Sequence, residues 1–364
     1  MHVFAQDNFS IPSITFRPMD FSEGEHFTEV LNHYFTNYRV QSWSRLNHPE
    51  INSVNYKVVV ESDGVTKNIL LRQYKSLSDY EQIVFYLNTI ETLSTYGVPV
   101  TQTLKSLNGE AAVQFGSDVF ALFVFLEGEY FSPREDNLTA VAKALAQLHN
   151  GFDQLPPNVG RTIEQYSQQT NVYYNIVRDY SVNDFEQIRA SIETQSVISS
   201  DEAEILKKIL DWILTVRTLK EKKKELDALP SGLIHSDVHP HNILMAGSNV
   251  KAIVDFDAMR ISQRARDVGM ALYWFGRQLL LDKNDEEARE QAPKIRELFL
   301  EQYTDVRQLS AAEYGAMPWL VREEYIKKLL LVLKAVYLQH NETWKKDLGK
   351  FIMAFEELPY FWPK

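Results

Sequence analysis

The chain has 364 residues, of which 45% are hydrophobic and none is cysteine, and its formal net charge is −11. The negative charge argues against a protein that coats nucleic acid or an anionic membrane, and the lack of cysteine excludes disulfides, thiolate metal sites and a cysteine nucleophile. The sequence shows no secretory signal pattern near its start and no apolar run long enough to span a bilayer. We therefore expect a cytoplasmic protein that binds neither nucleic acid nor a membrane, and the oligomeric state is left open.

The first third of the chain predicts an antiparallel sheet with an inserted helix. Apolar residues at helical spacing predict a short amphipathic helix at 21–36, and a longer helix is predicted from 78 to 96. Strand patterns occur in five runs: 39–46, 55–61, 68–74, 111–115 and 119–126. Ser62-Asp63-Gly64 supplies a turn between the second and third of these runs.

From Asn137 onward the pattern is mainly helical. Helical spacing covers five segments: 138–149, 201–228, 266–281, 285–305 and 321–356. Strand signals return only at 231–257. Because the composition changes near residue 128, we expect an α+β fold with two lobes, 1–127 built on the antiparallel sheet and 128–364 mainly helical.

The strand segment near the middle of the helical part predicts a hairpin. Two apolar runs, 243–246 and 250–254, are separated by residues typical of turns. If Ser248 and Asn249 form a two-residue loop, antiparallel pairing places Asn242 opposite Asp255.

Oxygen-bearing side chains would therefore meet at the open end of this hairpin. Asp237 precedes the hairpin, and Asp257 follows Asp255 closely. Amide and carboxylate oxygens suit Mg²⁺, which takes one or two carboxylates together with substrate phosphates. An aspartate that the metal does not need can accept a proton from a hydroxyl group, which is the chemistry of phosphoryl transfer.

The order of these residues resembles a known motif. H-x-D-x-H-P-x-N at 235–242, followed by I-V-D-F-D at 253–257, resembles the Brenner-type motif of the aminoglycoside phosphotransferase and choline kinase superfamily. The resemblance implies a bilobal protein-kinase-like fold in which the larger lobe binds the acceptor. It also implies the following roles: Asp237 as catalytic base, His235 as a support for its loop, and Asn242 and Asp255 as magnesium ligands with Asp257 as a further candidate. Ser236 stands where glycine is usual.

Further segments resemble the same superfamily. ALAQLH at 144–149 resembles the helix that opens the large lobe, and FVFLEGE at 123–129 resembles the hinge, so Phe125 and Glu127 are expected beside ATP. The stretch 50–74 resembles the first hairpin and third strand of homoserine-kinase-like and N-acetylhexosamine-kinase-like branches, which adds Asn52 to the expected nucleotide contacts.

Two features of the expected small lobe depart from protein kinases. Arg72 stands where a phosphate-binding lysine is usual, and Glu81 is the carboxylate expected to pair with it. The loop at 47–54 contains no glycine, in contrast to the glycine-rich loop of protein kinases.

Several alternatives are open at this point. His235, His239 and His241 alternate along the chain as zinc ligands can, which would suit a zinc hydrolase. Arg72 and the glycine-free loop also fit a non-catalytic nucleotide-binding module of the same fold. Asp267 either caps its helix or holds the backbone of the 235–237 loop.

The leading prediction is a Mg²⁺- and ATP-dependent phosphotransferase that acts on a hydroxyl group of a small molecule. Homoserine or another amino alcohol, an amino sugar, an aminoglycoside and choline are all open as acceptors, and GTP is open as the donor. The acceptor site is expected within 150–200 and 267–345. Most of the many aromatic residues toward the C-terminus are expected in the core rather than in a cage for an ammonium group.

Overall fold

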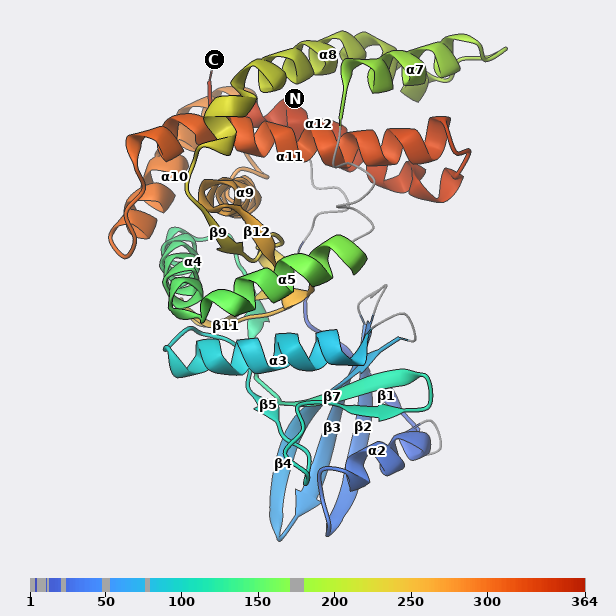
Figure 1. Cartoon of the computed structure of the whole chain (residues 1–364), viewed down its shortest axis with the longest axis vertical. Coiled ribbons are helices and arrows are strands. Elements are labelled where there is room, and N and C mark those ends of the chain that lie inside the picture. The colour runs from blue at the N-terminus through green and yellow to red at the C-terminus, as the bar shows by residue number, and fades with distance from the viewer. Residues whose placement is uncertain are drawn as a thin grey trace.

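The computed structural model combines an antiparallel sheet at one end with a larger, mainly helical part at the other (Figure 1). This confirms the predicted α+β class. The structure describes residues 4, 11, 13–20, 24–47, 53–75, 79–170 and 180–363. Asn52, one of the expected nucleotide contacts, lies outside the described residues.

The main sheet has seven strands in the order β1-β2-β3-β4-β7-β5, with β6 also paired to β7, and every pairing is antiparallel. The strands are β1 (Phe16–Met19), β2 (Tyr38–Leu46), β3 (Ser53–Ser62), β4 (Val65–Tyr74), β5 (Thr103–Leu104), β6 (Val113–Phe115) and β7 (Asp118–Val124). The five predicted strands are confirmed, whereas β1 and β5 were not predicted. Asp63 and Gly64 form the predicted turn with φ angles of 52° and 75°, as a two-residue hairpin loop requires.

A helix packs against each face of the main sheet. On one face, α2 (Thr28–Asn32) covers a core that includes Trp43, Tyr56 and Val58. The other face carries α3 (Tyr80–Thr95) on a core that includes Leu87 and Phe123. The helix expected at 21–36 is shorter than predicted, since its α-helical part ends at Asn32.

A short link carries the chain from the main sheet to a second sheet. After β7, the segment 125–128 leads into β8 (Glu129–Tyr130), which pairs with β10 (Ile243–Ala246), and β10 pairs with β11 (Asn249–Ile253). A Cβ atom on Gly128 would lie 2.9 Å from the carbonyl oxygen of Met245. Only glycine therefore allows the link to pass this close to the second sheet. The boundary expected at residue 127 falls in this link and stays a prediction.

Helices form most of the remaining chain. They are α4 (Glu135–Gln154), α5 (Pro157–Thr170), α7 (Val182–Glu193), α8 (Ser200–Asp227), α9 (Arg264–Gln278), α10 (Asp285–Thr304), α11 (Ala311–Tyr337) and α12 (Lys345–Phe361). The helical pattern at 321–356 is two helices rather than one, because the backbone of His340 turns to a φ of 54° between them. None of the described helices combines the length and apolar character that a membrane span requires.

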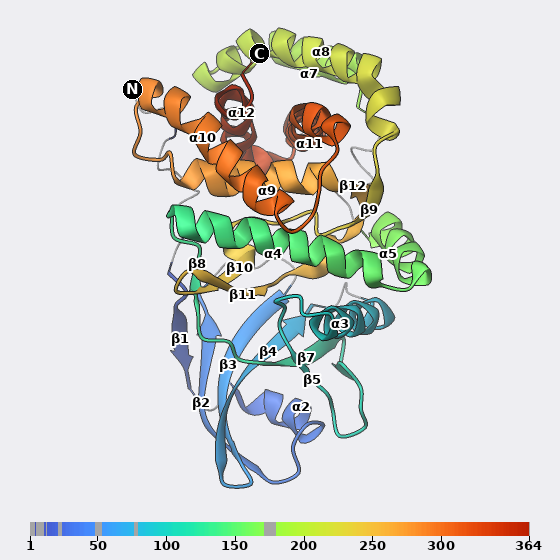
Figure 2. The ribbon, with the colours of Figure 1, turned by 90° about the vertical axis from the view of Figure 1, so that its left-hand side faces the viewer.

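The helices enclose one large hydrophobic core, and α4 lies between the second sheet and the C-terminal helices (Figure 2). β9 (Ser231–Ile234) and β12 (Arg260–Gln263) pair with each other. In the sequence, β9 precedes the predicted site and β12 follows it. Most C-terminal aromatic residues, including Tyr273, Tyr325 and Phe361, are buried in this core, as expected.

Candidate active site

The hairpin of β10 and β11 forms as predicted, but its register differs. The turn residues are Gly247 and Ser248, and Gly247 adopts a φ of 59°, which glycine accepts most readily. A bulge between Leu244 and Met245 shifts the pairing once more. As a result the carbonyl of Asn242 accepts a hydrogen bond from the Val254 amide at 3.0 Å. The prediction that Asn242 faces Asp255 was therefore wrong by one residue.

Asp255 lies just beyond the end of β11. Its φ of 65° and ψ of 67° place it in the left-handed region, which only a small share of residues other than glycine adopt. Such backbone strain persists where the surrounding structure imposes it, and it is concentrated at functional sites. Here it directs the chain out of the strand and into the short 3-10 turn Phe256–Ala258, which carries Asp257.

His235 connects the 235–242 loop to the end of β11. Its ring is fully buried, and burial lowers the pKa of the imidazole, so the ring is neutral near pH 7. Nε2 lies 3.0 Å from the carbonyl oxygen of Val254 and Nδ1 lies 3.3 Å from the Asp237 amide. A neutral ring that donates from Nε2 and accepts at Nδ1 satisfies both contacts. His235 thus positions Asp237, as the predicted supporting role requires.

Asp267, in the first turn of α9, binds the backbone of the 235–242 loop. Its carboxylate accepts hydrogen bonds from the amides of His235 at 3.0 Å and Ser236 at 2.9 Å. His149 lies 3.1 Å from this carboxylate and 2.7 Å from the Tyr303 hydroxyl. All these side chains except that of Ser236 are buried. The loop-holding alternative for Asp267 is confirmed.

Ser236 itself has a φ of 71°, which explains why glycine is usual at this position. The sequence did not single out Tyr303, because nothing near it in the chain signals its contact with His149, 154 residues away.

The carboxylate of Asp237 is accessible and ionised. Its side chain is 42% exposed and lies 3.4 Å from Nε2 of His239. The Asn242 amide nitrogen donates to Asp237 at both the side chain, 3.2 Å away, and the backbone carbonyl, 2.8 Å away. Desolvation would raise the pKa of Asp237, but His239 above all, together with Lys328, holds this pKa well below its usual range. The charged form can therefore orient a hydroxyl group near pH 7.

Arg72 joins the main sheet to the other side of the site. Its Nη2 atom lies 2.9 Å from Asp255 and 3.1 Å from Asp257, residues that follow it by more than 180 positions. The arginine is nearly buried, while the two carboxylates are 41% and 46% exposed.

Glu81 is not the partner of Arg72. It is exposed in the first turn of α3, and no ion pair joins it to Arg72 in the part of the chain that the structure describes. The expected pairing was wrong, because the arginine reaches across to the end of β11 instead.

The donor set at this point fits a magnesium ion. The amide nitrogen of Asn242 is used by Asp237, which leaves its side-chain oxygen for a metal, and Asp255 and Asp257 add two partly exposed carboxylates.

The histidines do not form a zinc site. Both ring nitrogens of His235 are engaged within the protein, and His239 contacts Asp237 and Asn242. Among the described residues, no group of three or more histidine, aspartate or glutamate side chains is arranged to hold a metal alone. The zinc hydrolase alternative has no structural support.

The predicted hinge residues lie in the link between the two sheets. The Phe125 amide donates to the carbonyl of Asn68 at 3.2 Å, and Nζ of Lys57 lies 4.3 Å from the centre of the Phe125 ring. The backbone carbonyl of Glu127 accepts a hydrogen bond from Lys251 at 2.7 Å, while its side chain is exposed.

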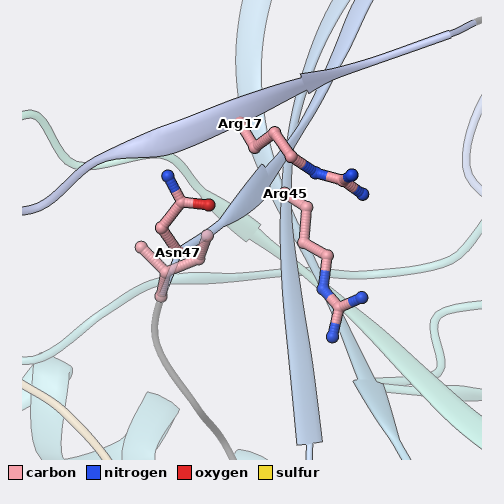
Figure 3. Close-up of a pocket in the computed structure, with 4 residues that line it drawn as sticks. Arg17, Arg45 and Asn47 are labelled. Carbon is pink, nitrogen blue, oxygen red and sulfur yellow. The ribbon is translucent and has the colours of Figure 1, made fainter.

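A pocket lined by Arg17, Arg45 and Asn47 lies elsewhere (Figure 3). Arg45 pairs with Tyr56 in the sheet register, whereas Arg72 pairs with Asn55. Neighbouring positions on a strand point to opposite faces, so this pocket opens on the face away from Arg72. It is not part of the site described above.

Residues 42–320 match the phosphotransferase enzyme family. The chain belongs to this family. It is similar to a homoserine kinase of Nitrobacter hamburgensis, with 27% identity over 266 residues, 72% of this chain and 71% of the relative.

Solved structures show the same fold at low sequence identity. A spectinomycin phosphotransferase, solved with ADP and spectinomycin, matches with a TM-score of 0.65 and 14% identity over 93% of this chain and 97% of that one. A microcompartment-associated aminopropanol kinase matches with a TM-score of 0.59 and 20% identity over 94% of this chain and 97% of that one.

The comparisons confirm the resemblance to aminoglycoside phosphotransferases and the protein-kinase-like fold. The chain is a phosphotransferase of the small-molecule kinase type. The sequence alone had left a non-catalytic nucleotide-binding module open. The comparisons favour a small-molecule kinase over that alternative.

Proposed function

We propose that this enzyme transfers the γ-phosphoryl group of ATP, bound with Mg²⁺, to the hydroxyl group of a small amino alcohol such as homoserine. One observation carries the proposal: the ionised, accessible Asp237 lies on a loop tied to the end of β11, where Asp255 and Asp257 meet Arg72 from the main sheet. A proton acceptor, metal-binding oxygens and a phosphate-binding cation are therefore grouped as phosphoryl transfer needs.

Asp237 acts on the acceptor. The acceptor oxygen forms a bond to the γ-phosphorus, the bond from that phosphorus to the bridging oxygen of ADP breaks, and the hydroxyl proton passes to Asp237. A strongly ionised carboxylate is a weak base, but the transition state of phosphoryl transfer is loose and needs orientation more than early deprotonation. His235 is a positioning residue, since its ring is buried and both of its ring nitrogens are engaged by backbone groups of the site.

The other residues of the site would bind the phosphate donor, Mg-ATP. Asn242, Asp255 and Asp257 would hold Mg²⁺, which when bound neutralises charge on the phosphates. Arg72 would contact phosphate oxygens, since a guanidinium group with more than one free N–H can serve a carboxylate and a phosphate together. We place the adenine beside Phe125 and Glu127, in the link between the two sheets, and keep Asn52 as an expected contact.

The names of the relatives support an amino alcohol as the proposed acceptor. The curated relatives are named homoserine kinases, and the aminopropanol kinase of the same fold also acts on an amino alcohol, as its name states. Amino sugars and aminoglycosides are the alternative acceptors, because a spectinomycin phosphotransferase shares the fold.

The test is acceptor-dependent formation of ADP. The purified enzyme is given Mg-ATP or Mg-GTP with L-homoserine, 3-aminopropan-1-ol, choline or spectinomycin, and the phosphorylated product is identified by mass spectrometry. We expect ADP to form in step with a phosphorylated amino alcohol and to stop when EDTA removes the metal. No ADP with any hydroxyl compound would overturn the proposal.

A binding measurement with one variant tests the donor side separately. Asp255→Asn should weaken the affinity for Mg-ATP by about tenfold or more, because a charged metal ligand becomes neutral. Binding of ATP in EDTA should change little. Unchanged affinity for Mg-ATP would remove Asp255 from the metal site.

A further inference from the structure

We infer that His239 is a positioning residue for Asp237. Its Nε2–H group is directed at Oδ2 of Asp237, so that Oδ1 is left to receive the hydroxyl group of the acceptor. This inference rests on the proposed function and deepens it, because it names the atom of Asp237 that acts on the acceptor and a residue that the reaction described above does not use.

The backbone places the His239 ring at the start of a short 3-10 turn, Pro240–Asn242. His239 has a φ of −144° and a ψ of 169°, the extended conformation that a residue before proline favours. Nδ1 of its ring accepts a hydrogen bond from the His241 amide at 3.3 Å, which caps the turn. A ring nitrogen that accepts carries no proton, so the proton of the neutral imidazole is on Nε2.

The side-chain amide of Asn242 does not need Nε2 of His239 as an acceptor. Its nitrogen lies 3.2 Å from Nε2, but it has two hydrogens, and Asp237 offers an oxygen to each of them. These oxygens are the backbone carbonyl at 2.8 Å and Oδ2 at 3.2 Å. Nε2 of His239 therefore keeps its proton and faces the carboxylate.

The two oxygens of the Asp237 carboxylate have different surroundings. Oδ2 lies 3.2 Å from the side-chain nitrogen of Asn242 and 3.4 Å from Nε2 of His239. Oδ1 has no hydrogen-bond or ion-pair partner among the residues that the structure describes, and the side chain is 42% exposed. One oxygen is thus held by the protein, and the other is open to a ligand.

Neighbouring rings restrict how far the His239 ring can turn. The ring centre of His241 lies 5.5 Å away, and the two rings are almost perpendicular at 86°. His241 in turn contacts the Tyr130 ring of β8, with 5.4 Å between the ring centres. The 3.4 Å between Nε2 and Oδ2 is at the long end for a hydrogen bond, and such bonds of catalytic groups shorten when substrate binds. The ring is therefore already aimed at Asp237 before the acceptor arrives.

Two donors on one oxygen matter because a carboxylate can rotate about its Cβ–Cγ bond. Without a fixed orientation, the acceptor hydroxyl would meet the carboxylate at variable distances and angles. Phosphoryl transfer depends on orientation more than on early deprotonation, and a small displacement of the acting group lowers the rate strongly. We therefore expect loss of the His239 donor to lower kcat and to leave the KM for Mg-ATP unchanged.

Two variants separate the roles of the two ring nitrogens of His239. His239→Asn places an oxygen near the position of Nδ1, so it keeps the cap of the turn, but it is too short to reach Asp237. His239→Gln carries an N–H at about the distance of Nε2 and lacks the cap. His33→Asn is the matched control, because His33 is exposed at the end of α2, beside the main sheet.

Kinetic constants are measured with Mg-ATP and L-homoserine, or with 3-aminopropan-1-ol, choline or spectinomycin where the wild type uses one of these faster. We expect His239→Asn to lower kcat by about ten- to thirtyfold, with KM for Mg-ATP and the free energy of unfolding near the wild-type values. His239→Gln should recover most of kcat but unfold more easily. A role in capping alone would give the opposite order, with an active His239→Asn and an impaired His239→Gln.

A spectrum of the wild-type enzyme tests the position of the proton without any activity. Long-range ¹H–¹⁵N correlations of protein labelled with ¹⁵N-histidine show which ring nitrogen carries the proton. The His239 signal is the one that disappears in whichever His239 variant folds. We expect the form with the proton on Nε2.

The results separate this inference from the proposed function. A proton on Nδ1, or a folded His239→Asn enzyme with wild-type kcat, would refute the role of His239 while the kinase activity stands. If no hydroxyl compound is phosphorylated, the proposed function fails, and the role of Oδ1 fails with it even where the spectrum shows the proton on Nε2.

Discussion

The two sides of the active site are held in different ways. On the acceptor side, the 235–242 loop is fixed by a buried chain of hydrogen bonds from Tyr303 through His149 to Asp267. On the donor side, Arg72 meets two carboxylates that are each more than 40% exposed. The first arrangement is buried and closely hydrogen-bonded, whereas the second is open to solvent.

This difference separates stability from ligand binding. A buried carboxylate with several hydrogen bonds is costly to remove, because its partners lose their acceptor inside the protein. A partly exposed ion pair adds little to stability, so its members can exchange partners with a phosphate or a metal. We therefore expect substitutions in the buried residues that support the 235–242 loop to affect folding and turnover together, and those on the donor side to affect binding.

The largest effect should come from Asp267→Ala. The amides of His235 and Ser236 and the ring of His149 would lose their common acceptor, so the free energy of unfolding should fall by about 3–5 kcal/mol. Turnover should fall as well, because the loop that carries Asp237 loses its support. Chemical denaturation and steady-state kinetics measure the two effects. Asp267→Asn, which keeps one acceptor oxygen, should be milder; an Asp267→Ala enzyme with wild-type stability would show that the loop does not depend on this residue.

Acid should weaken the ion-pair cluster behind the same loop. Desolvation would raise the pKa of Glu323, but Arg266 and Lys327 lower it to about 2 from its ordinary value of 4.5. A lowered pKa stabilises the folded state above pH 4.5, and this contribution is lost as the pH falls from about 4.5 toward 2.

The lowered pKa of Glu323 corresponds to about 3 kcal/mol of folding stability at pH 7. Glu323→Gln should remove most of the acid dependence that Glu323 causes, and it should lower the stability at pH 7. Denaturation curves at several pH values test the expectation. Identical acid dependence in the variant and the wild type would contradict it.

Arg72→Met should act on the donor side alone. We expect KM for ATP to rise by about tenfold, since a charged phosphate contact is lost, while the free energy of unfolding changes by less than about 1 kcal/mol. Arg72→Lys should recover part of the affinity, because a point charge replaces the planar group. A loss of several kcal/mol in stability with unchanged KM would mean that Arg72 has only a structural role.

The smallest effect should come from Ser236→Gly. Glycine adopts a φ of 71° without the steric cost that serine meets, but it also gains freedom in the unfolded chain. The net result should be a gain of up to about 1 kcal/mol in stability with unchanged kinetic constants. A decrease in stability would show that the serine side chain contributes more than its backbone strain costs.

Local patterns were sufficient to predict most elements and the identity of the central residues. The hairpin at 243–253, the turn at Asp63-Gly64 and the roles suggested for His235 and Asp267 follow from residues that are close in sequence or belong to one motif. The hairpin register was wrong because it depends on which residue takes the left-handed turn position and on a bulge, and neither leaves a clear signal in the sequence.

Contacts between distant segments could not be predicted in the same way. Arg72 was expected to pair with Glu81, nine residues later, yet it reaches Asp255 and Asp257 across the site. Such contacts are set by how the helices are arranged, which the local pattern of residues does not encode.

Single-turnover phosphoryl transfer by Asp237→Asn, with Mg-ATP affinity measured on the same sample, tests the central claim most directly. Asparagine keeps the size of the side chain but cannot take the hydroxyl proton. We predict a rate at least about a hundredfold below that of the wild type, with Mg-ATP affinity and folding unchanged. A wild-type rate would contradict the account, because the carboxylate that the 235–242 loop holds in place would then have no part in the reaction.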